Sequence, residues 1–599
     1  MNIQSYSTDE LNTLAQDIRK KILETVSKNG GHLSSTMGAT DLIVAMHKVF
    51  DVEKDPFLFD VSHQAYAHKL LTGRWDDFET LRQFDGVCGY TKPSESKYDY
   101  YVAGHSSTSI SLAVGAAKAI ALKGEDRIPV AFIGDGSMSA GMVYEALNEL
   151  GDRKYPVIII LNDNEMSIAK PIGAISKLLS QTMAGSFYQK FKGKVEKTLE
   201  YFPESATYMA KRFEESFKMI TPGILFEEMG IEYIGPVNGH DIEALIETME
   251  VAKELGKPVI IHAQTTKGKG YEIAEGTKEH WHGVSAFDLK TGEAPKKSGA
   301  KAATAIFSDM LVQLADEDEK VVGVTAAMPS GTGMSAVMEK YPDRFWDVAI
   351  AEQHAVTSMG PLAKEGFKPF CTIYSTFLQR GYDQVIHDIC LMDLPVVFAM
   401  DRAGIVGEDG ETHQGVFDIS FLRAIPNMTL FAPYNESSMK EAMVFAKDYD
   451  HPCAFRYPRG AFLAKDRSCE AFELGKSELL QDGKEILFIG YGNGVGRAEQ
   501  TAKLMDENIA ILDLRFIKPL DEEMLLTLSK TYKKWYVFSD SAKQGGVGSA
   551  ILECLSQNRI NDIALTSFEY DDAFITHGNT KLVEESLGLL PEQLAKRIM

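Results

Sequence analysis

The sequence has few cysteines, no long apolar run and no excess of basic residues. Its 6 cysteines among 599 residues include no CxxC pair, so we expect reduced thiols in a cytoplasmic protein rather than a disulfide framework. No segment approaches the run of about 20 apolar residues that a membrane helix needs, and the polar, acidic N-terminal segment does not resemble a signal peptide. The formal net charge of −23 disfavours non-specific nucleic-acid binding, because such proteins usually carry a basic surface. We therefore expect neither a membrane nor a nucleic acid as a partner.

Short apolar strands alternate with longer helical patterns along the whole chain. Examples are IPVAFIGDG, PVIIILNDN and LPVVFAMDRAG. Continuous apolar strands separated by helices are typical of parallel sheets that are covered on both faces. The pattern occurs about three times, which predicts an α/β protein of three doubly wound domains with mainly parallel sheets.

Two breaks in this pattern divide the chain. Segment 289–302 (LKTGEAPKKSGAKA) is rich in glycine, proline and lysine and has no apolar period, so it is a predicted linker. A weaker break falls near residues 464–470. We therefore predict domains at residues 1–300, 301–467 and 468–599, with a helical insertion at about 168–221 in the first. The insertion is equally consistent with a lid and with a simple packing cover.

Polar residues follow two neighbouring strands of the first predicted domain. Asp135 lies in GDG at the end of one strand, and Asn164 lies in NDN at the end of the next. The carboxyl ends of neighbouring parallel strands face the same crevice, so the two side chains can reach one metal ion. A carboxylate, an amide oxygen and a backbone carbonyl suit Mg²⁺, which also takes phosphate oxygens. GDG alone is more often a turn, but the pair predicts a diphosphate held through Mg²⁺.

The order of these and other motifs resembles one enzyme family. GDG followed by NDN resembles the transketolase-like thiamine-diphosphate enzymes. Within that superfamily the 1-deoxy-D-xylulose-5-phosphate synthases have motifs similar to GGHL, DVSHQAY, GHSSTS, NDNEMSI, AIAEQHA, IYSTFLQR, DRAGIVGEDGETHQG and RYPRG. The similarity covers essentially the whole chain, and the three predicted domains resemble the diphosphate-binding, pyrimidine-binding and C-terminal domains of transketolase.

The resemblance implies a reaction and its cofactors. We expect thiamine diphosphate and Mg²⁺ to support the condensation of pyruvate with D-glyceraldehyde 3-phosphate, which gives 1-deoxy-D-xylulose 5-phosphate and CO₂. This is the first step of the non-mevalonate route to isoprenoid precursors, and its product also feeds thiamine and pyridoxal biosynthesis. The resemblance also implies a homodimer.

The resemblance implies roles for the matching positions in the first domain. The metal ligands are expected to be Asp135, Asn164 and the backbone carbonyl of Met166. Further positions that would contact the cofactor are His63, Gly104, His105, Ser106, Gly136, Ser137 and Tyr271. Two positions depart from the family pattern: Ser62 stands where a glycine is usual, and Asp41 where a glutamate is usual.

The same resemblance points to catalytic groups. Glu352 in AEQH matches the glutamate that shifts the aminopyrimidine of the cofactor to its imino tautomer, and burial should raise its pKa. His32, His63 and His413 lie in predicted strand-to-helix loops and would line the substrate cleft, where they would move protons. His282 is a fourth candidate, although a single histidine is more often structural. Phe377 matches a residue that packs against the cofactor ring, or it is ordinary core.

An acidic chain with anionic substrates needs a local basic cluster. Arg380, Arg402, Arg456 and Arg459 all follow predicted strands of the second domain, and guanidinium groups bind phosphate through two parallel hydrogen bonds. The resemblance assigns contacts with the acceptor phosphate to Tyr374, Arg402 and Arg459. It places Asp409 and His413 beside the rest of the acceptor. Arg380 is a further candidate, with a surface salt bridge as the alternative.

Other interpretations remain open. Transketolase proper shares the cofactor but takes ketose phosphates as donors. The decarboxylating component of pyruvate dehydrogenase needs a lipoyl partner, and the basic cluster disfavours it. A non-catalytic homologue would be expected to lose Glu352, Asp135 or Asn164, and all three are present. The third domain shows no cluster of titratable residues that predicts chemistry, so we expect it to serve packing and dimerisation.

Overall fold

The computed structural model describes residues 3–164, 223–276, 279–295, 299–505 and 508–599. The chain forms two compact units: unit 1 contains Met1–Arg82 and Gly86–Pro295, and unit 2 contains Gln83–Asp85 and Lys296–Met599. The predicted insertion at 168–221 and the predicted ligand Met166 lie outside the described residues. None of the described helices has the length and apolar content that crossing a bilayer requires.

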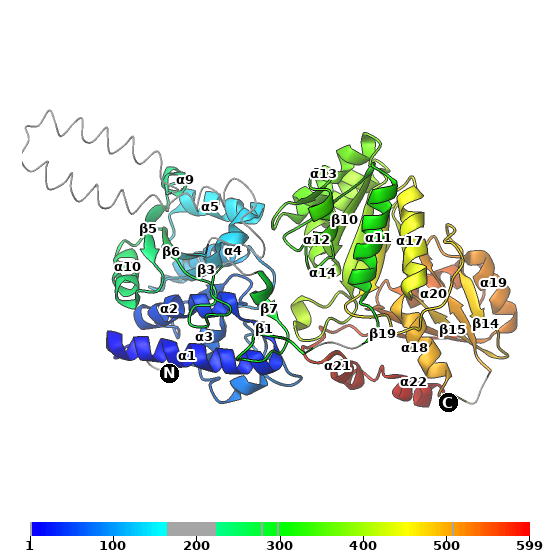
Figure 1. Ribbon diagram of the computed structural model, residues 1–599, viewed down its shortest axis with the longest axis horizontal. Helices are drawn as coiled ribbons and strands as arrows, with labels where there is room; N and C mark the ends of the chain where they lie inside the picture. The colour runs from blue at the N-terminus through cyan, green and yellow to red at the C-terminus, as the bar shows by residue number, and fades with distance from the viewer. Residues whose placement is uncertain (1–2, 165–222, 277–278, 296–298, 506–507) are drawn as a thin grey trace, which may run out of the picture. The chain divides into compact units, whose positions relative to one another are not determined.

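Unit 1 is built on a parallel sheet of five strands in the order β2-β3-β4-β6-β5, of which β3, β6 and β5 are labelled in Figure 1. These strands are β2 (Phe57–Phe59), β3 (Val130–Gly134), β4 (Ile158–Asp163), β5 (Glu232–Asn238) and β6 (Val259–Gln264). A separate antiparallel ladder pairs β1 (Gly31–His32) with β7 (Gly283–Val284). The described helices are α1 (Thr8–Asn29), α2 (Ser34–Val49), α3 (Tyr66–Leu71), η1 (Asp77–Thr80), α4 (Ser109–Lys123), η2 (Asp135–Ser139), α5 (Gly141–Arg153), α9 (Ile224–Glu228), α10 (Ile242–Glu254) and η4 (Glu279–Trp281).

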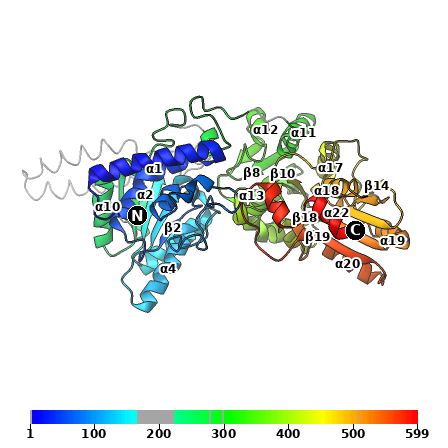
Figure 2. The ribbon, with the colours of Figure 1, turned by 90° about the horizontal axis from the view of Figure 1, so that it is seen from below.

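Apolar residues on both faces of this sheet explain why its strands read as continuous apolar runs. Val130 and Phe132 of β3 belong to the core that α1, α2 and α10 share, whereas Ala131 and Ile133 belong to the core with α4 and α5. Figure 2 shows α1 on one side of β2 and α4 on the other. Successive strand residues point to opposite faces, so each face needs its own apolar set.

Unit 2 contains a sheet of seven strands in the order β17-β12-β13-β11-β10-β8-β9, in which only β17 is antiparallel to its neighbour. The strands are β8 (Val321–Thr325), β9 (Phe345–Asp347), β10 (Lys368–Tyr374), β11 (Val397–Ala403), β12 (Thr429–Phe431), β13 (Cys453–Pro458) and β17 (Phe516–Lys518). Its helices are α11 (Ala303–Glu317), α12 (Ser335–Lys340), α13 (Glu352–Lys364), α14 (Ser375–Leu378), η5 (Gln379–Gly381), α15 (Tyr382–Gln384), η6 (Val385–Cys390), η7 (Gly410–Thr412), α16 (Asp418–Arg423) and α17 (Glu436–Asp448).

A second sheet of unit 2 has five strands in the order β14-β16-β15-β18-β19. The strands are β14 (Glu478–Gln481), β15 (Ile486–Gly490), β16 (Ala510–Asp513), β18 (Lys534–Ala542) and β19 (Ala564–Tyr570). The helices of this part are α18 (Asn493–Ala502), α19 (Glu522–Thr531), α20 (Val547–Gln557), α21 (Thr580–Ser586) and α22 (Pro591–Ile598). The prediction of an α/β protein with mainly parallel sheets is confirmed.

The two sheets of unit 2 share one core. Phe398 and Met400 of the larger sheet belong to the same apolar cluster as Leu487, Trp535 and Val537 of the smaller one. In addition, β17 follows the smaller sheet's β16 in sequence but pairs with β12 of the larger sheet. The predicted boundary at residue 467 falls inside this unit, between β13 and β14, and it stays a prediction.

Candidate functional site

Three neighbouring strands of unit 1 have polar residues at or just after their carboxyl ends, which together form one edge of the sheet. Gly134 of β3 is in register with Asn162 of β4, and Asp163 of β4 is in register with Gln264 of β6. Both ends of the Asn162 amide have partners inside the protein, because its Nδ2 donates to Gln64 Oε1 at 3.1 Å and its Oδ1 accepts from Thr265 at 2.6 Å. Asn162 therefore holds the edge together, and Asp135 and Asn164 remain for a ligand.

Asp135 and Asn164 have the properties of cation ligands. Asn164 Oδ1 is buried and accepts no hydrogen bond from the described residues. Burial and the neighbouring charge of Asp163 raise the pKa of Asp135 to about 8, although Lys267 acts in the opposite direction. A buried amide oxygen without a donor and a carboxyl group whose charge is disfavoured are both stabilised by a bound divalent cation. These two oxygen donors fit Mg²⁺.

A chain of three buried polar groups lies behind this edge. Asp163 Oδ2 is 2.8 Å from His262 Nε2, and His262 Nδ1 is 2.6 Å from the hydroxyl of Tyr233. The three side chains come from β4, β6 and β5, which are adjacent in the sheet. This chain fixes the carboxylate that stands next to Asn164.

The loop with the predicted cofactor residues Gly104, His105 and Ser106 is tied to the same sheet edge. Asp60, which follows β2, accepts hydrogen bonds from the backbone of Ser107 at 2.7 Å and of Ser109 at 3.1 Å, at the start of α4. The hydroxyl of Ser107 donates to the carbonyl of Ser137 at 2.8 Å. The structure thus brings the loop of Gly104–Ser106 to η2, which contains the predicted residues Gly136 and Ser137.

Three of the four histidines that are predicted to be catalytic form a cluster in unit 1. The ring centroids of His32, His63 and His282 are separated by 5.4 Å, 5.7 Å and 5.1 Å in pairs. The ladder of β1 with β7 explains the grouping, because it pairs His32 with Gly283, the residue after His282. Ser35 Oγ lies 3.0 Å from His282 Nδ1. The fourth predicted histidine, His413, belongs to unit 2.

Burial keeps His63 and His282 of this cluster neutral. The pKa of His63 is well below its ordinary value because the ring is buried and stands near His282 and His32. The pKa of His282 is lowered in the same way by burial, and then by the charge of Lys267. A neutral imidazole can accept a proton. Burial and a neighbouring imidazole both disfavour the positive charge that the ring then carries.

Lys267 was not among the predicted site residues. It is 6% exposed, lies shortly after β6 and lowers the pKa of Asp135, His63 and His282. The segment TTKG follows the third strand at the edge that carries Asp135 and Asn164. That position was the signal in the sequence, because ligands bind where parallel strands end.

Tyr271 lies in an aromatic group, and its hydroxyl has an internal partner. Its ring is 5.6 Å from that of Trp281 and 6.1 Å from that of Phe287, and its hydroxyl donates to the carbonyl of Leu289 at 3.0 Å. Contact of Tyr271 with a cofactor stays a prediction.

The two departures from the family pattern have local explanations. Ser62 is buried in a left-handed conformation with φ of 65°, which favours glycine, and its hydroxyl accepts a hydrogen bond from the backbone of Thr91 at 2.9 Å. Asp41 is buried and pairs with Arg19 and with His240, whose Nδ1 lies 2.8 Å away. Burial alone would raise the pKa of Asp41, but these two partners lower it.

In unit 2, Glu352 is buried at the first position of α13. It is 4% exposed, and its Oε2 accepts no hydrogen bond from the described residues. Burial raises its pKa, as predicted, while Arg380 acts in the opposite direction. Arg380 Nη1 is 3.8 Å from Glu352 Oε2. The side chain of Arg380 is 13% exposed and faces a buried carboxyl group, so the alternative of a surface salt bridge is wrong, whereas its contact with the acceptor phosphate stays a prediction.

Tyr374 is the centre of a second group in unit 2. Its ring stacks on Phe377 with centroids 5.3 Å apart, and the guanidinium of Arg402 lies 4.4 Å from its centroid. The ring of Phe377 also meets that of His413 at 5.5 Å. Burial raises the pKa of Tyr374, and the charges of Arg402, Asp401, Arg459 and Asp409 all act on it. The predicted residues Tyr374, Phe377, Arg402, Asp409, His413 and Arg459 are therefore brought together.

Arg402 keeps part of its guanidinium unused. Its Nη1 donates to Gly331 O at 2.5 Å and to Thr304 Oγ1 at 3.1 Å, and it lies 2.9 Å from Asp401 Oδ1. All of its side-chain hydrogen bonds with the described residues leave from Nη1. The adjacent Nε and Nη2 form the fork that binds a phosphate or carboxylate.

Arg459 is more exposed than Arg402. Its Nη1 donates to Val406 O at 2.5 Å and pairs with Glu408 at 3.0 Å, and its side chain is 42% exposed. It reaches the loop that carries Asp409 and His413.

Arg456 was expected in the basic cluster, and this expectation is wrong. The residue lies inside β13, is 3% exposed and pairs with Asp418 at 2.9 Å and with Asp540 of β18. Its Nη2 donates to Gly415 O at 3.2 Å. The guanidinium is therefore a structural link between the two sheets of unit 2.

Comparison with known proteins gives matches along the whole chain. Residues 1–265 match the family model of 1-deoxy-D-xylulose-5-phosphate synthase, residues 300–463 the transketolase pyrimidine-binding domain, and residues 475–594 the transketolase C-terminal domain. The 1-deoxy-D-xylulose-5-phosphate synthase of Sulfurimonas denitrificans is 70% identical, over 100% of this chain and 99% of that protein. The protein of the same name from a Nitratiruptor species is 69% identical over the same shares. Among solved structures, the transketolase from Campylobacter jejuni subsp. jejuni is 19% identical, with a TM-score of 0.43 over 98% of this chain and 99% of that chain.

Proposed function

This chain belongs to the 1-deoxy-D-xylulose-5-phosphate synthase family, and we propose that it condenses pyruvate with D-glyceraldehyde 3-phosphate to give 1-deoxy-D-xylulose 5-phosphate and CO₂. The observation that carries the proposal is the 70% identity with a synthase of that name along the entire chain. The buried acidic, basic and imidazole groups described above are of the kinds that the reaction needs.

The strand-end residues of unit 1 are proposed to hold the cofactor's diphosphate through Mg²⁺. Asp135 and Asn164 would supply two oxygen ligands, and the carbonyl of Met166 is the third ligand that the family resemblance implies. Backbone amides of Gly136, Ser137 and the loop of Gly104–Ser106 suit the phosphate oxygens. Thiamine diphosphate, when bound, supplies the carbanion chemistry that decarboxylates pyruvate.

Glu352 is proposed to hold a proton against the pyrimidine nitrogen of the cofactor. Burial raises its pKa and so favours the protonated acid, which is the form that can donate. Arg380 acts on Glu352, because its charge opposes the effect of burial on the pKa of that carboxyl group, and a contact of Arg380 with the acceptor phosphate stays a prediction. His32, His63 and His282 are proposed to accept and return protons, and burial favours the neutral form of His63 and His282.

The group around Tyr374 is proposed to select a phosphorylated acceptor. Arg402 offers the phosphate its Nε and Nη2, which have no hydrogen-bond partner among the described residues, and Arg459 adds a second positive charge from a more exposed position. Asp409 would hydrogen-bond to acceptor hydroxyls, and His413 would protonate the acceptor oxygen as it gains charge.

A direct assay tests the proposal. The chain with thiamine diphosphate and Mg²⁺ should release CO₂ from pyruvate when glyceraldehyde 3-phosphate is added, and mass spectrometry should detect deoxyxylulose phosphate. Transketolase activity is the second candidate, and it would appear as turnover of a ketose phosphate with an aldose phosphate, without CO₂. That outcome, or no thiamine diphosphate uptake at saturating Mg²⁺ in calorimetry, would overturn the proposal.

The oligomeric state and location are also proposals. We propose a homodimer, as the family resemblance implies, and light scattering coupled to size-exclusion chromatography tests it. A monomer at assay concentration would exclude it. The cytoplasmic location stays a prediction from the cysteine pattern.

A further inference from the structure

The loop that carries Asp409 and His413 is closed at its base by its own backbone. We call residues 404–413 the acceptor loop. Gly404 N donates to Gly415 O at 2.7 Å, and Gly415 N donates to Gly404 O at 2.8 Å. Away from this pair of hydrogen bonds at its base, the loop must be held in shape by contacts with other segments.

Gln414 supplies two such contacts. It is 3% exposed, its Oε1 accepts from Val406 N at 2.7 Å, and its Nε2 donates to Thr576 O at 3.1 Å. Val406 belongs to the acceptor loop, whereas Thr576 follows β19 of the smaller sheet. One buried amide therefore ties the acceptor loop to the C-terminal part of the chain.

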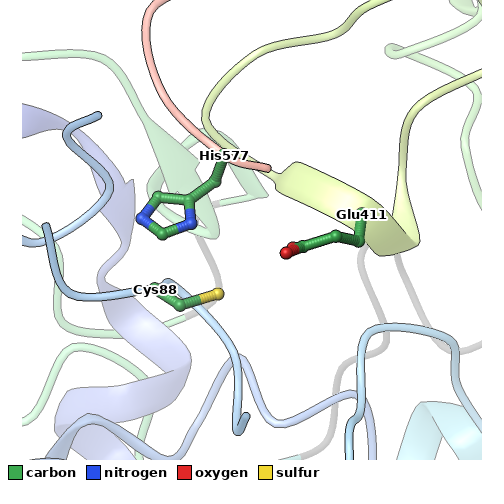
Figure 3. A group of neighbouring side chains, drawn as sticks. All are labelled: Cys88, Glu411 and His577. Atoms are coloured by element: carbon green, nitrogen blue, oxygen red, sulfur yellow. The ribbon is translucent and has the colours of Figure 1, made fainter. Parts of the chain in front are cut away.

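The segment 575–580 packs closely along the same loop. Gly578 N donates to Gly407 O at 3.3 Å. Gly407 and Gly410 both have positive φ, and added Cβ atoms would meet Gly578 O at 3.0 Å and His577 Cβ at 2.9 Å respectively. Figure 3 shows His577 beside the short helix η7, which carries Glu411. The glycines let the two backbones approach this closely.

We propose that Gln414 is a positioning residue, through which the C-terminal segment 575–580 sets the shape of the acceptor loop and so the fit of the aldehyde acceptor. The inference rests on the proposed function, because it assumes that Asp409 and His413 act on the acceptor. It gives the third predicted domain a part in the reaction in addition to packing.

The chemistry of a buried amide explains why this residue has the role. The Val406 N–H and the Thr576 carbonyl are main-chain groups that need partners when they are away from water. Gln414 satisfies both at once, and it can do so in one orientation only, because its oxygen must face Val406 and its nitrogen must face Thr576. Removing the amide leaves two unsatisfied groups and frees the loop from the segment.

Gln414→Met tests the proposal, because methionine has a similar length and can make neither hydrogen bond. We expect the Michaelis constant for glyceraldehyde 3-phosphate to rise about tenfold, the effect of two modest hydrogen bonds that orient the loop. The Michaelis constant for pyruvate should change less than about threefold, because the loop carries no proposed pyruvate contact apart from His413. Hydrogen exchange should increase in peptides that cover 404–413 and 575–580.

Gln414→Glu provides a signature that a merely structural role would not give. Its carboxylate can accept from Val406 but cannot donate to Thr576, whereas the protonated acid can do both. Burial raises the pKa of such a carboxyl group. The acceptor Michaelis constant of this variant should therefore return toward the unmodified value as the pH is lowered through about 8 to 6, and that of Gln414→Met should show no such recovery.

Glycine variants give a matched control. Gly407→Ala and Gly366→Ala both place alanine at positive φ, but only at residue 407 does the new Cβ meet another segment. Gly407→Ala should reproduce the acceptor effect, and Gly366→Ala should leave both Michaelis constants unchanged. Equal effects of Gln414→Met on the two substrates, or unchanged exchange at 404–413, would overturn the positioning role. Absence of product from the unmodified chain would instead overturn the proposed function.

Discussion

Arg402 allows the assignment of the acceptor site to be tested quantitatively. Arg402→Ala removes a guanidinium whose Nη1 is hydrogen-bonded to Gly331 and Thr304 and whose Nε and Nη2 form no hydrogen bond within the described part of the chain. It also leaves Asp401, which is fully buried and has a pKa raised by burial, without its ionic partner. Thr304 at 2.7 Å and the backbone of Arg402 at 2.6 Å still donate to Asp401, so the local structure retains two hydrogen bonds.

The expected effect follows from the geometry of this Nε and Nη2 edge. A hydrogen bond to a charged group contributes about 1.5–3 kcal/mol, which corresponds to a factor of about 10 to 150 in binding. Coulomb attraction at 4 Å and an effective dielectric constant near 20 is about 4 kcal/mol before desolvation, so the upper end of that range is physically available. Arg459, with a side chain 42% exposed and paired with Glu408, should contribute less than about tenfold.

The assay compares glyceraldehyde 3-phosphate with unphosphorylated glyceraldehyde in both enzymes. The Michaelis constant for the phosphorylated acceptor should rise about 10- to 150-fold in Arg402→Ala. The constants for glyceraldehyde and for pyruvate should stay within about threefold, because neither carries the phosphate. General damage from the unpaired Asp401 would raise all three constants. Parallel increases for the two aldehydes would therefore refute the assignment of Arg402 to the phosphate.

Three further predictions concern Glu352, Ser62 and Asp513. Glu352→Gln should retain thiamine diphosphate binding in calorimetry but lower turnover by at least about 100-fold, since it cannot pass a proton as the acid does; near-normal turnover would remove this role. Ser62→Ala should lower the unfolding temperature more than Ser62→Gly, because both lose the hydrogen bond to Thr91 while only glycine relieves the positive φ; the reverse order would contradict this account. Burial raises the pKa of Asp513 to about 7, above its value in the unfolded chain. The native state therefore retains a proton that the unfolded state loses, and stability falls as the pH rises from about 4 to about 7, by roughly 2 kcal/mol between pH 5 and 7. Asp513→Asn should flatten this dependence in denaturant unfolding, and an unchanged slope would show that Asp513 is not its source.

The sequence predicted residues well where local pattern determines position. Asp135 and Asn164 follow apolar strands, and neighbouring parallel strands end at the same edge, so their proximity required no long-range information. The burial of Glu352 and the direction of its pKa shift also followed from its place at the end of an apolar segment. The resemblance to a family then supplied the roles that position alone does not give.

The roles of the arginines were harder to predict, because the partner of a guanidinium group can be distant in sequence. Arg402 and Arg456 both lie near the ends of apolar strands, yet Arg456 is buried against Asp540 of another sheet. Arg380 meets Glu352, which lies on a different helix. Neither ion pair can be predicted from the local sequence. Carboxyl groups are common along the chain, and only the packing of the sheets determines which of them pairs with each arginine.

The contribution of the C-terminal part was missed for a related reason. A search for titratable clusters finds acids, bases and metal ligands, but segment 575–580 acts on the acceptor loop through a main-chain carbonyl at Thr576, a main-chain amide at Gly578 and the backbone space left by Gly407 and Gly410. Every residue has a backbone carbonyl, so the chemical identity of Thr576 says nothing about this role. Gln414 is the side chain that makes this contact. The sequence indicates its role only weakly, because a neutral amide next to His413 can equally face solvent. A buried glutamine next to a glycine-rich loop, rather than another charged group, is therefore the feature by which such a positioning contact can be sought in a sequence.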